Sequence, residues 1–300
     1  MMSVSIHLSA VLSFVLAGMP ALTQDRFAEV RIKATHVAGA VYMLEGAGGN
    51  IGVSVGADGV LIVDDQFAPL AERIRAAIET LEHGKGRLHF VLNTHWHPDH
   101  VGGNATFSRE AHIIAHENVR KRLSTQQKIF ERVIEPSPSV ALPVITFDDT
   151  LSVHFNGERI RLVHVPHAHT DGDSVIWFPK SNVVHMGDLF FAGKFPFVDL
   201  GSGGDVEGLI RGVAQAMERL PAGVKVIPGH GPLSTPADLK TYQQMLIDSV
   251  KIVRERIAAG KTLDEIKAAG MPEKYADWGD GFIKTDAWLE TVYNSLTRKP

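Results

Sequence analysis

The order of apolar segments along the chain predicts an α/β fold in which helices lie outside layered β-sheets. Strand-like segments are followed by amphipathic helical segments, and this order occurs twice. The chain has 300 residues, of which 44% are hydrophobic, so it can bury a sizeable core. We find no internal repeat and no linker-like segment, and we therefore expect one domain over residues 24–300.

Residues 1–23 resemble a secretory signal peptide. The stretch 10–22 is apolar and rich in small residues, and Thr23 before Gln24 ends a segment that resembles a processing site. The first seven residues carry no Lys or Arg, which departs from the usual signal. We expect a periplasmic or secreted protein, with a cytoplasmic location as the alternative if the segment is not a signal. The run is too short and too interrupted for a membrane span.

The N-terminal half begins with strand patterns and continues into helical ones. Strands are expected at residues 37–45, 51–55, 59–63, 88–93 and 112–115. A helix is expected at 69–81, where the apolar residues fall on one face, and another at 116–135. The proline-rich segment 136–143 indicates a surface loop that we expect to act as a flap near the site.

The C-terminal half shows strand patterns first and then mostly helical ones. Residues 151–165 have the pattern of a hairpin that turns at Asn156 and Gly157. Further strands are expected at 174–178, 183–186 and 224–227. Helices are expected at 205–220, at 236–259 with Thr235 as the cap, at 261–269 and at 285–297.

Charge and cysteine content exclude several functions. The formal net charge is −4 and no dense basic patch occurs, so nucleic acid is not an expected partner. Cysteine is absent, which excludes disulfides, thiolate metal ligands and a cysteine nucleophile. Without thiolates, nitrogen and oxygen atoms must hold any bound metal. The chain has 15 histidines, a large number that could supply the nitrogen ligands. We expect a small-molecule substrate and no membrane partner after signal removal.

The segment between Thr94 and His100 carries four potential metal ligands after a strand-like run. Sites in open α/β sheets usually lie at such strand exits. His95 and His97 are two residues apart, so in an extended segment both imidazoles face the same side and can hold one ion. Asp99 and His100 can face a second ion. Imidazole with carboxylate suits zinc and, less selectively, iron or manganese.

Three later segments also place ligand-type residues after predicted strands. His167 and His169 lie in the first, and both are chemically able to bind zinc. Asp188 follows a glycine in the second, and a carboxylate there could bridge two cations. His230 lies between two glycines in the third. A histidine of the core would instead be expected inside its strand.

The motifs THWHPDH, AHTDGDS, MGDLFF and PGHGP, in this order, resemble those of the metallo-β-lactamase superfamily over residues 37–255. The resemblance implies a four-layer αββα sandwich, with two facing β-sheets and a dinuclear site along one sheet edge. It also implies two Zn²⁺ per chain and hydrolysis by a metal-bridging hydroxide. It selects His169 rather than His167. The implied ligands are His95, His97 and His169 for one ion, Asp99, His100 and His230 for the other, and Asp188 between the two.

The position of Asp188 separates this chain from the best-known lactamases of the superfamily, which have a cysteine there. Another lactamase subclass lacks a bridging carboxylate. The bridging-Asp pattern is similar to that of glyoxalase II, lactonases and many unassigned hydrolases. We expect a zinc hydrolase acting on a lactam, lactone, ester or thioester, with β-lactamase activity included. The alternative is an iron-dependent oxidoreductase for persulfide or oxygen chemistry on the same fold.

Residues around the ligands are expected to assist them. Asp99 is the expected catalytic residue, because it could orient the hydroxide or pass its proton to the leaving group. Asp64 or Asp65 could hold ligand histidines through N–H bonds, the alternative being a turn residue. Asp171 and Asp173 could do the same or cap a turn.

Substrate contacts are less well defined by the sequence. Lys194 could pair with a substrate carboxylate, and the phenylalanines around it could line an apolar pocket. Trp96 lies between two ligands and must point away from them, so we expect it to pack in the core. The remaining histidines are expected at the surface or in the core: His83, His89, His112, His116, His154, His164 and His185.

Overall fold

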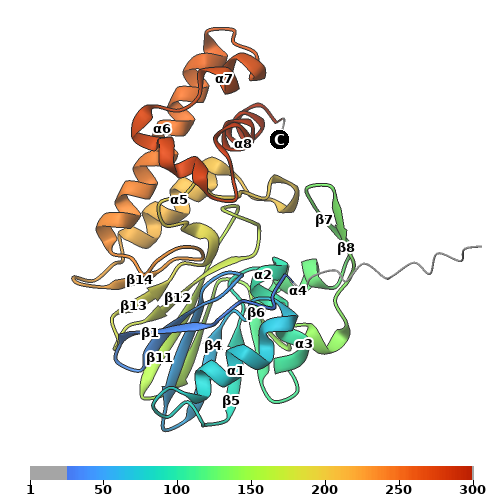
Figure 1. Cartoon of the computed structure of the whole chain (residues 1–300), viewed down its shortest axis with the longest axis vertical. Coiled ribbons are helices and arrows are strands. Elements are labelled where there is room, and N and C mark those ends of the chain that lie inside the picture. The colour runs from blue at the N-terminus through green and yellow to red at the C-terminus, as the bar shows by residue number, and fades with distance from the viewer. Residues whose placement is uncertain (1–25, 299–300) are drawn as a thin grey trace, which may run out of the picture.

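The computed structural model describes residues 26–298, and in this range two β-sheets face each other with helices on both outer sides (Figure 1). Side chains of both sheets meet in a central core, where Leu61 and Val63 of one sheet join Leu162 and Ile176 of the other. Two further clusters lie between the sheets and their outer helices. These four layers confirm the predicted αββα sandwich.

The first sheet has seven strands within the described residues, in the order β1-β2-β3-β4-β5-β6-β9. They are β1 (Lys33–Ala38), β2 (Val41–Glu45), β3 (Ile51–Gly56), β4 (Gly59–Val63), β5 (Leu88–Leu92), β6 (His112–His116) and β9 (Ile145–Phe147). The strands β1 to β4 are antiparallel, and β4, β5, β6 and β9 run parallel. Alternate residues of β4 enter the central and the outer core, so this strand is buried on both faces.

The second sheet has five strands in the described part of the chain, in the order β10-β11-β12-β13-β14. They are β10 (Thr150–Phe155), β11 (Glu158–Val165), β12 (Asp173–Phe178), β13 (Val183–His185) and β14 (Lys225–Ile227). Only the β13–β14 pair is parallel among these five. Asn156 and Gly157 between β10 and β11 have φ values of 50° and 71°, which fits the tight hairpin turn expected from Asn-Gly.

The helices cover the outer faces of both sheets. They are α1 (Ala71–Glu79), α2 (Pro98–Val101), α3 (Asn104–Phe107), α4 (Glu117–Leu123), α5 (Val206–Met217), α6 (Pro236–Ala258), α7 (Leu263–Ala269) and α8 (Thr285–Thr297). Short 3₁₀ turns occur at Ala68–Leu70, Ser139–Ala141, Gly187–Leu189, Leu200–Ser202 and Glu273–Asp280. None of the helices between residues 26 and 298 is long and apolar enough to cross a membrane.

Apolar side chains attach the longer helices to the sheets. Ile74 and Ile78 of α1 pack on the outer face of the first sheet. The second sheet is covered by α5 and α6, whose apolar residues share a cluster with Trp288 of α8. Thr235 and Asp238 form a reciprocal capping box at the start of α6, which confirms the predicted cap.

The strand predicted at residues 37–45 is confirmed over Val41–Glu45 but is not continuous, because the chain turns before Val41. β1 ends at Ala38 and β2 begins at Val41. Gly39 between them has φ +55°, a backbone conformation that favours glycine. The two halves therefore pair as antiparallel neighbours.

The helix predicted at residues 116–135 is also wrong beyond Leu123. The chain there forms a hairpin of β7 (Gln127–Ile129) and β8 (Arg132–Ile134) that projects from the body (Figure 1). Ile129 and Ile134 pack on the cluster around Trp96. Burial of these two side chains on the body outweighs the weak helical pattern of the segment. The proline-rich segment 136–143 follows this hairpin and contains the turn Ser139–Ala141, and its role as a flap stays a prediction.

Candidate metal centre

All seven candidate ligands lie beyond the ends of strands, at one edge of the sandwich. The segment His95 to His100 follows β5, and His169 lies between β11 and β12. Asp188 follows β13, and His230 follows β14. The carboxyl ends of these strands meet at this edge, where sites of α/β folds usually lie.

The first group of ligands contains three imidazoles and one carboxylate, all buried. The Nδ1 atom of His97 lies 3.1 Å from Nε2 of His95 and 2.8 Å from Nε2 of His169. The Oδ2 atom of Asp188 lies 3.8 Å and 3.5 Å from the Nε2 atoms of His95 and His169. All four potential donor atoms lie within 4.8 Å of one another, so they could hold one ion.

The second group is formed by Asp99, His100 and His230. The Nε2 atom of His230 lies 3.4 Å from Nε2 of His100 and 3.4 Å from Oδ2 of Asp99. The His100 side chain is fully buried, whereas those of His230 and Asp99 are 31% and 27% exposed. The second group therefore lies on the open side of the site, where a substrate can enter.

Asp188 joins the two groups through its two carboxylate oxygens. Oδ2 faces the first group, while Oδ1 lies 3.1 Å from His100 Nε2 and 3.4 Å from His230 Nε2. Gly229 passes close by, and a Cβ atom there would lie 2.1 Å from Oδ1. The glycine before His230 is thus required by the close approach of the backbone to this carboxylate.

Hydrogen bonds fix the ring nitrogens of the first group. His97 Nε2 donates to Asp199 Oδ2 at 3.0 Å, and His169 Nδ1 donates to the Phe197 carbonyl at 2.8 Å. Each bond holds the proton on the nitrogen that faces away from the site. The nitrogens that face the site therefore carry lone pairs, the form in which imidazole binds a metal.

Asp64 has the same effect on the neighbouring ligands. Its Oδ2 atom accepts hydrogen bonds from His100 Nδ1 and Thr94 Oγ1, both at 2.7 Å. Because Thr94 Oγ1 donates to Asp64, it accepts from His95 Nδ1 at 3.0 Å. One buried carboxylate thus orients a ligand in each group, as expected for Asp64 or Asp65.

The donor set fits divalent metal ions. Zinc–nitrogen bonds of about 2.0–2.1 Å in a tetrahedral site place ligand atoms about 3.3 Å apart, close to the separations seen here. Lone pairs that face each other at 2.8 Å, as between His97 and His169, repel unless a cation lies between them. Asp188 Oδ1 is buried and accepts no hydrogen bond, which is costly for a carboxylate without a cation.

The electrostatics of the site keep the imidazoles of His95 and His169 neutral and stabilise positive charge near the carboxylates. Burial lowers the pKa of His95 well below its ordinary value and lowers that of His169 to about 4. Burial also lowers the pKa of His100, but the charges of Asp188, Asp99 and Asp64 outweigh it and raise that pKa well above its ordinary value. Positive charge is therefore stabilised at the position between these carboxylates.

Other predicted site residues lie outside the two groups. His167 is exposed, and its Nδ1 atom contacts the Gly203 carbonyl, so the structure places His169 and not His167 among the ligands. Lys194 donates to the Asp277 carbonyl at 2.9 Å. Trp96 is buried in an apolar cluster, in keeping with the expected packing role.

The remaining aspartates have structural partners. Asp65 accepts from the Gly103 backbone N–H, and burial raises the pKa of its carboxyl well above the usual range. Asp171 pairs with Arg122 at 2.7 Å. Asp173 accepts from the backbone N–H and hydroxyl of Thr170, and burial raises its pKa to about 7. Asp173 therefore caps the turn after His169.

Two residues that position ligands were not predicted from the sequence, namely Asp199 and Asn50. Asp199 is separated from His97 by 102 residues and follows no predicted strand, so only its place before Gly201 and Ser202 indicates a turn. Asn50 donates to the carbonyls of Pro228 and Gly231 and holds the loop that carries His230. No local pattern in the sequence connects Asn50 with that loop.

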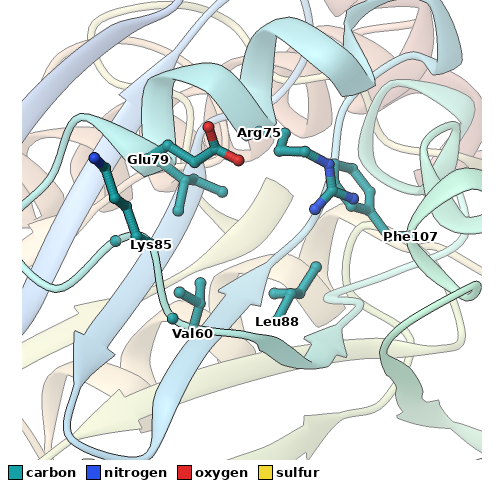
Figure 2. Close-up of a pocket in the computed structure, with 9 residues that line it drawn as sticks. Val60, Arg75, Glu79, Lys85, Leu88 and Phe107 are labelled. Atoms are coloured by element: carbon teal, nitrogen blue, oxygen red, sulfur yellow. The ribbon is translucent and has the colours of Figure 1, made fainter.

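Two hollows elsewhere on the surface are lined by none of the candidate ligands. The first, about 40 Å³, lies between α1 and the strands β4 and β5 (Figure 2). Figure 2 shows Arg75 and Glu79 of α1 above Val60 and Leu88 of these strands. The second, about 550 Å³, lies beside β6 and the segment before β9. Within residues 26–298, both groups of side chains that lie close enough to hold an ion belong to the strand-end site.

Comparisons with known proteins agree with the fold and the motifs. The family model of the metallo-beta-lactamase superfamily matches residues 44–230. The chain is 30% identical over 158 residues to hydroxyacylglutathione hydrolase of Methylococcus capsulatus, covering 51% of this chain and 52% of that enzyme. It is 27% identical over 215 residues to the enzyme of the same name from Rhodospirillum rubrum, covering 70% of this chain and 71% of that one.

A solved metallo-beta-lactamase from Pontibacter korlensis has the same fold, with a TM-score of 0.60 and 17% identity over 73% of this chain and 100% of that chain. The chain spans about half the length, 40% and 52%, of the first curated relatives that it matches. The relatives include metallo-hydrolases, and the two His/Asp groups could bind metal. By its family-model match over residues 44–230, this chain belongs to the metallo-β-lactamase superfamily.

Proposed function

We propose that the protein is a hydrolase with two zinc ions that cleaves a carbonyl substrate, namely a lactam, lactone, ester or thioester. The observation that carries this proposal is the buried Asp188 carboxylate, whose two oxygens face two separate groups of ligand atoms. Such a carboxylate is typical of two-metal hydrolases. The names of two relatives, both hydroxyacylglutathione hydrolases, favour thioesters among these substrates.

The chain's own residues would hold the ions and move a proton. When bound, two such ions lower the pKa of a water molecule to roughly 7, so that hydroxide is available near neutral pH. His95, His97 and His169 would hold one ion, and Asp99, His100 and His230 the other. Asp199 and Asp64 keep the imidazoles in the metal-binding tautomer.

Asp99 would handle the proton of the reaction. Its side chain is 27% exposed on the open side, and its Oδ2 atom lies 3.4 Å from His230 Nε2. A carboxylate there can take the proton of the attacking water and deliver it to the leaving heteroatom. Hydrolysis then yields a carboxylic acid and a thiol, alcohol or amine.

The test is a hydrolysis panel on the zinc-loaded protein with nitrocefin, a carbapenem, homoserine lactones, S-lactoylglutathione and aryl esters. At least one of these classes should be cleaved, and cleavage should stop when the metal is chelated. Metal analysis of protein purified without added metal completes the test. Two zinc ions per chain support the proposal, whereas coloured, iron-containing protein would favour oxygen or persulfide chemistry instead.

The Asp99→Asn variant tests the role of the carboxylate. It should lose most of its activity, by about 100-fold or more, because the proton acceptor is gone. The matched control is Asp264→Asn on the exposed surface of α7, which should keep wild-type turnover. Near wild-type turnover of Asp99→Asn with full metal content would contradict the assignment.

We also propose that the protein is exported. The segment that carries this proposal, residues 1–23, lies outside the described residues. Expression in a bacterial host followed by fractionation and mass measurement should give a mature chain that begins at Gln24. Recovery of the uncleaved chain in the cytoplasm would contradict export.

A further inference from the structure

Three phenylalanines from distant parts of the chain form a continuous aromatic surface at the metal site, which we call the aromatic rim: Phe130, Phe197 and Phe282. The ring of Phe130 lies 4.9 Å from that of Phe197 and 6.0 Å from that of Phe282. Phe197 in turn packs on the imidazoles of His97 and His169, at 5.5 Å and 5.8 Å. The rim therefore extends from the first ligand group to the surface.

The outer part of the rim is open to solvent. Phe282 is 79% exposed and Phe130 is 55% exposed, and Val133 beside Phe130 on the hairpin is 55% exposed. Large apolar side chains that gather at one exposed place commonly mark a binding site. Here the exposed rings are connected through Phe197 to ligand histidines, so the occupant that fits is a substrate of the metal site.

The conformation of Phe130 supports a functional role for its ring. β7 and β8 are joined by the two residues Phe130 and Glu131. Phe130 has φ +51°, and Glu131 is not among the residues with positive φ. A positive φ at the first residue of a two-residue hairpin turn is a conformation that favours glycine. Phenylalanine at a position that favours glycine strains the backbone, so the turn itself does not explain why the ring is there. A contact made by the ring would explain it.

Apolar residues of the hairpin and of the C-terminal segment anchor the rim to the body of the protein. Ile129 and Ile134 at the base of the hairpin pack on the buried cluster around Trp96. Ile283, next to Phe282, is buried in the core beneath the C-terminal helices. Phe282 lies outside residues 44–230, the part of the chain that the family model matches. The C-terminal segment thus adds a side chain of its own to the entrance.

The position of the rim indicates which part of the substrate it contacts. Asp99, which is proposed to serve the leaving group, belongs to the second ligand group on the open side. Phe197 packs on the first group, and its carbonyl accepts from His169. The acyl side of a substrate would therefore lie toward the rim. Lys194 donates to the Asp277 carbonyl, so an apolar contact is better supported there than a charged one.

We infer that the aromatic rim binds an aryl-sized apolar acyl group of the substrate and makes the enzyme selective for such acyl groups. This inference rests on the proposed hydrolase function. Stacking of an aryl group on several rings favours it over a methyl group, in the ground state as well as in the transition state. The preference should therefore be visible both in turnover and in equilibrium binding.

The test compares two thioesters of N-acetylcysteamine, one with a phenylacetyl and one with an acetyl group, on the zinc-loaded full chain. The wild type should show a kcat/KM at least about tenfold higher for the phenylacetyl thioester. The variants Phe130→Gly and Phe282→Ala should reduce this preference to about threefold or less. Phe130→Gly places glycine where the turn prefers it, so loss of the ring is separated from loss of the hairpin.

Two controls and a second measurement complete the design. His83→Gly replaces another exposed residue with positive φ, at 62°, and should leave the preference unchanged. Calorimetric binding of phenylacetohydroxamate and acetohydroxamate reports the aryl preference without any turnover. The wild type should bind phenylacetohydroxamate about tenfold more tightly than acetohydroxamate. The variants Phe130→Gly and Phe282→Ala should lose this difference in affinity.

Each outcome bears on one of the two proposals. Equal turnover of both thioesters and equal binding of both hydroxamates would overturn the rim proposal while leaving hydrolysis intact. A preference that survives in both variants would also overturn it. Variants that shift the molecular mass in light scattering but not the preference would show a contact between copies of the chain instead. Aryl-selective binding without cleavage of any substrate class in the hydrolysis panel would support the rim and count against the hydrolase.

Discussion

At the residue scale, hydrogen-bond acceptors set the tautomers of four buried ligand histidines, and two of these acceptors are aspartates from distant parts of the chain. Asp64 lies 36 residues from His100, and Asp199 lies 102 residues from His97. Each acceptor leaves the lone pair of the imidazole directed into the site. These two aspartates therefore act as positioning residues, whose effect is on metal affinity and on the orientation of the ligands.

Replacement of Asp199 by Asn should weaken metal binding in the first group. The imidazole of His97 loses its charged acceptor, so we expect about 10- to 100-fold lower zinc affinity. Competition with a chromophoric chelator measures this directly. The exposed Asp264→Asn variant serves as the control and should bind zinc like the wild type. Unchanged affinity of Asp199→Asn would show that the hydrogen bond to His97 is dispensable.

At the scale of elements, a stacked pair of histidines joins the two sheets. His116 lies at the end of β6 and His164 lies in β11. Their ring centroids are 3.6 Å apart, and the rings are nearly parallel. Burial lowers the pKa of both, and His116 also lowers that of His164. Their other partners are fixed, because His116 Nε2 donates to the Asp148 carbonyl and His164 Nδ1 to that of Asp173.

This pair should make the stability of the fold depend on pH. Both pKa values are lower in the folded state, so the unfolded chain binds more protons as the pH falls below about 6.5. The stabilisation is complete above that pH and is lost as the pH falls through the folded pKa values. His164→Phe keeps a stacked ring without a titrating group. Its free energy of unfolding, measured by denaturant titration, should decline less between pH 6.5 and 5 than that of the wild type.

Parallel pH profiles of the two proteins would contradict this role of the pair. His154→Phe on the neighbouring strand β10 is the control, because His154 is exposed and faces no other histidine in the described structure. That control should follow the wild-type profile.

Local signals were sufficient for some elements and not for others. The box at Thr235 and Asp238 marks the start of α6, and Asn156 with Gly157 marks a hairpin, because the side chains act within a few residues. The hairpin of β7 and β8 was missed because the helical pattern of its sequence is overridden by packing of Ile129 and Ile134. The strand β9 has only three residues and is stabilised by pairing with β6.

At the scale of the whole molecule, the metal site connects the two sheets. His95, His97, Asp99 and His100 follow a strand of the first sheet, whereas His169, Asp188 and His230 follow strands of the second. Bound ions would therefore hold the two halves of the sandwich together at this edge. An ion that binds only the folded chain adds to its stability by mass action.

Removal of metal should lower the unfolding temperature. At a free zinc concentration 1,000 times the dissociation constant, one site adds about 4 kcal/mol to the free energy of unfolding. Scanning calorimetry of chelated and zinc-loaded protein measures this shift. Asp188→Ala lacks the carboxylate between the groups, so zinc should raise its unfolding temperature much less. An equal rise in both proteins would mean that zinc binds elsewhere.

The sequence alone predicted the α/β layers and the main strands and helices, because period and turn chemistry are local properties. The seven candidate ligands followed from ligand spacing together with the family resemblance, which selected His169 over His167. That Asp188 faces both ligand groups was expected from family resemblance, and the structure now shows the geometry. Only the tertiary structure brought Asp199 and Asn50 to the ligand loops and Phe130 to Phe282. These contacts join residues far apart in the chain, and their partners are chosen by packing of the two sheets, which no local pattern encodes.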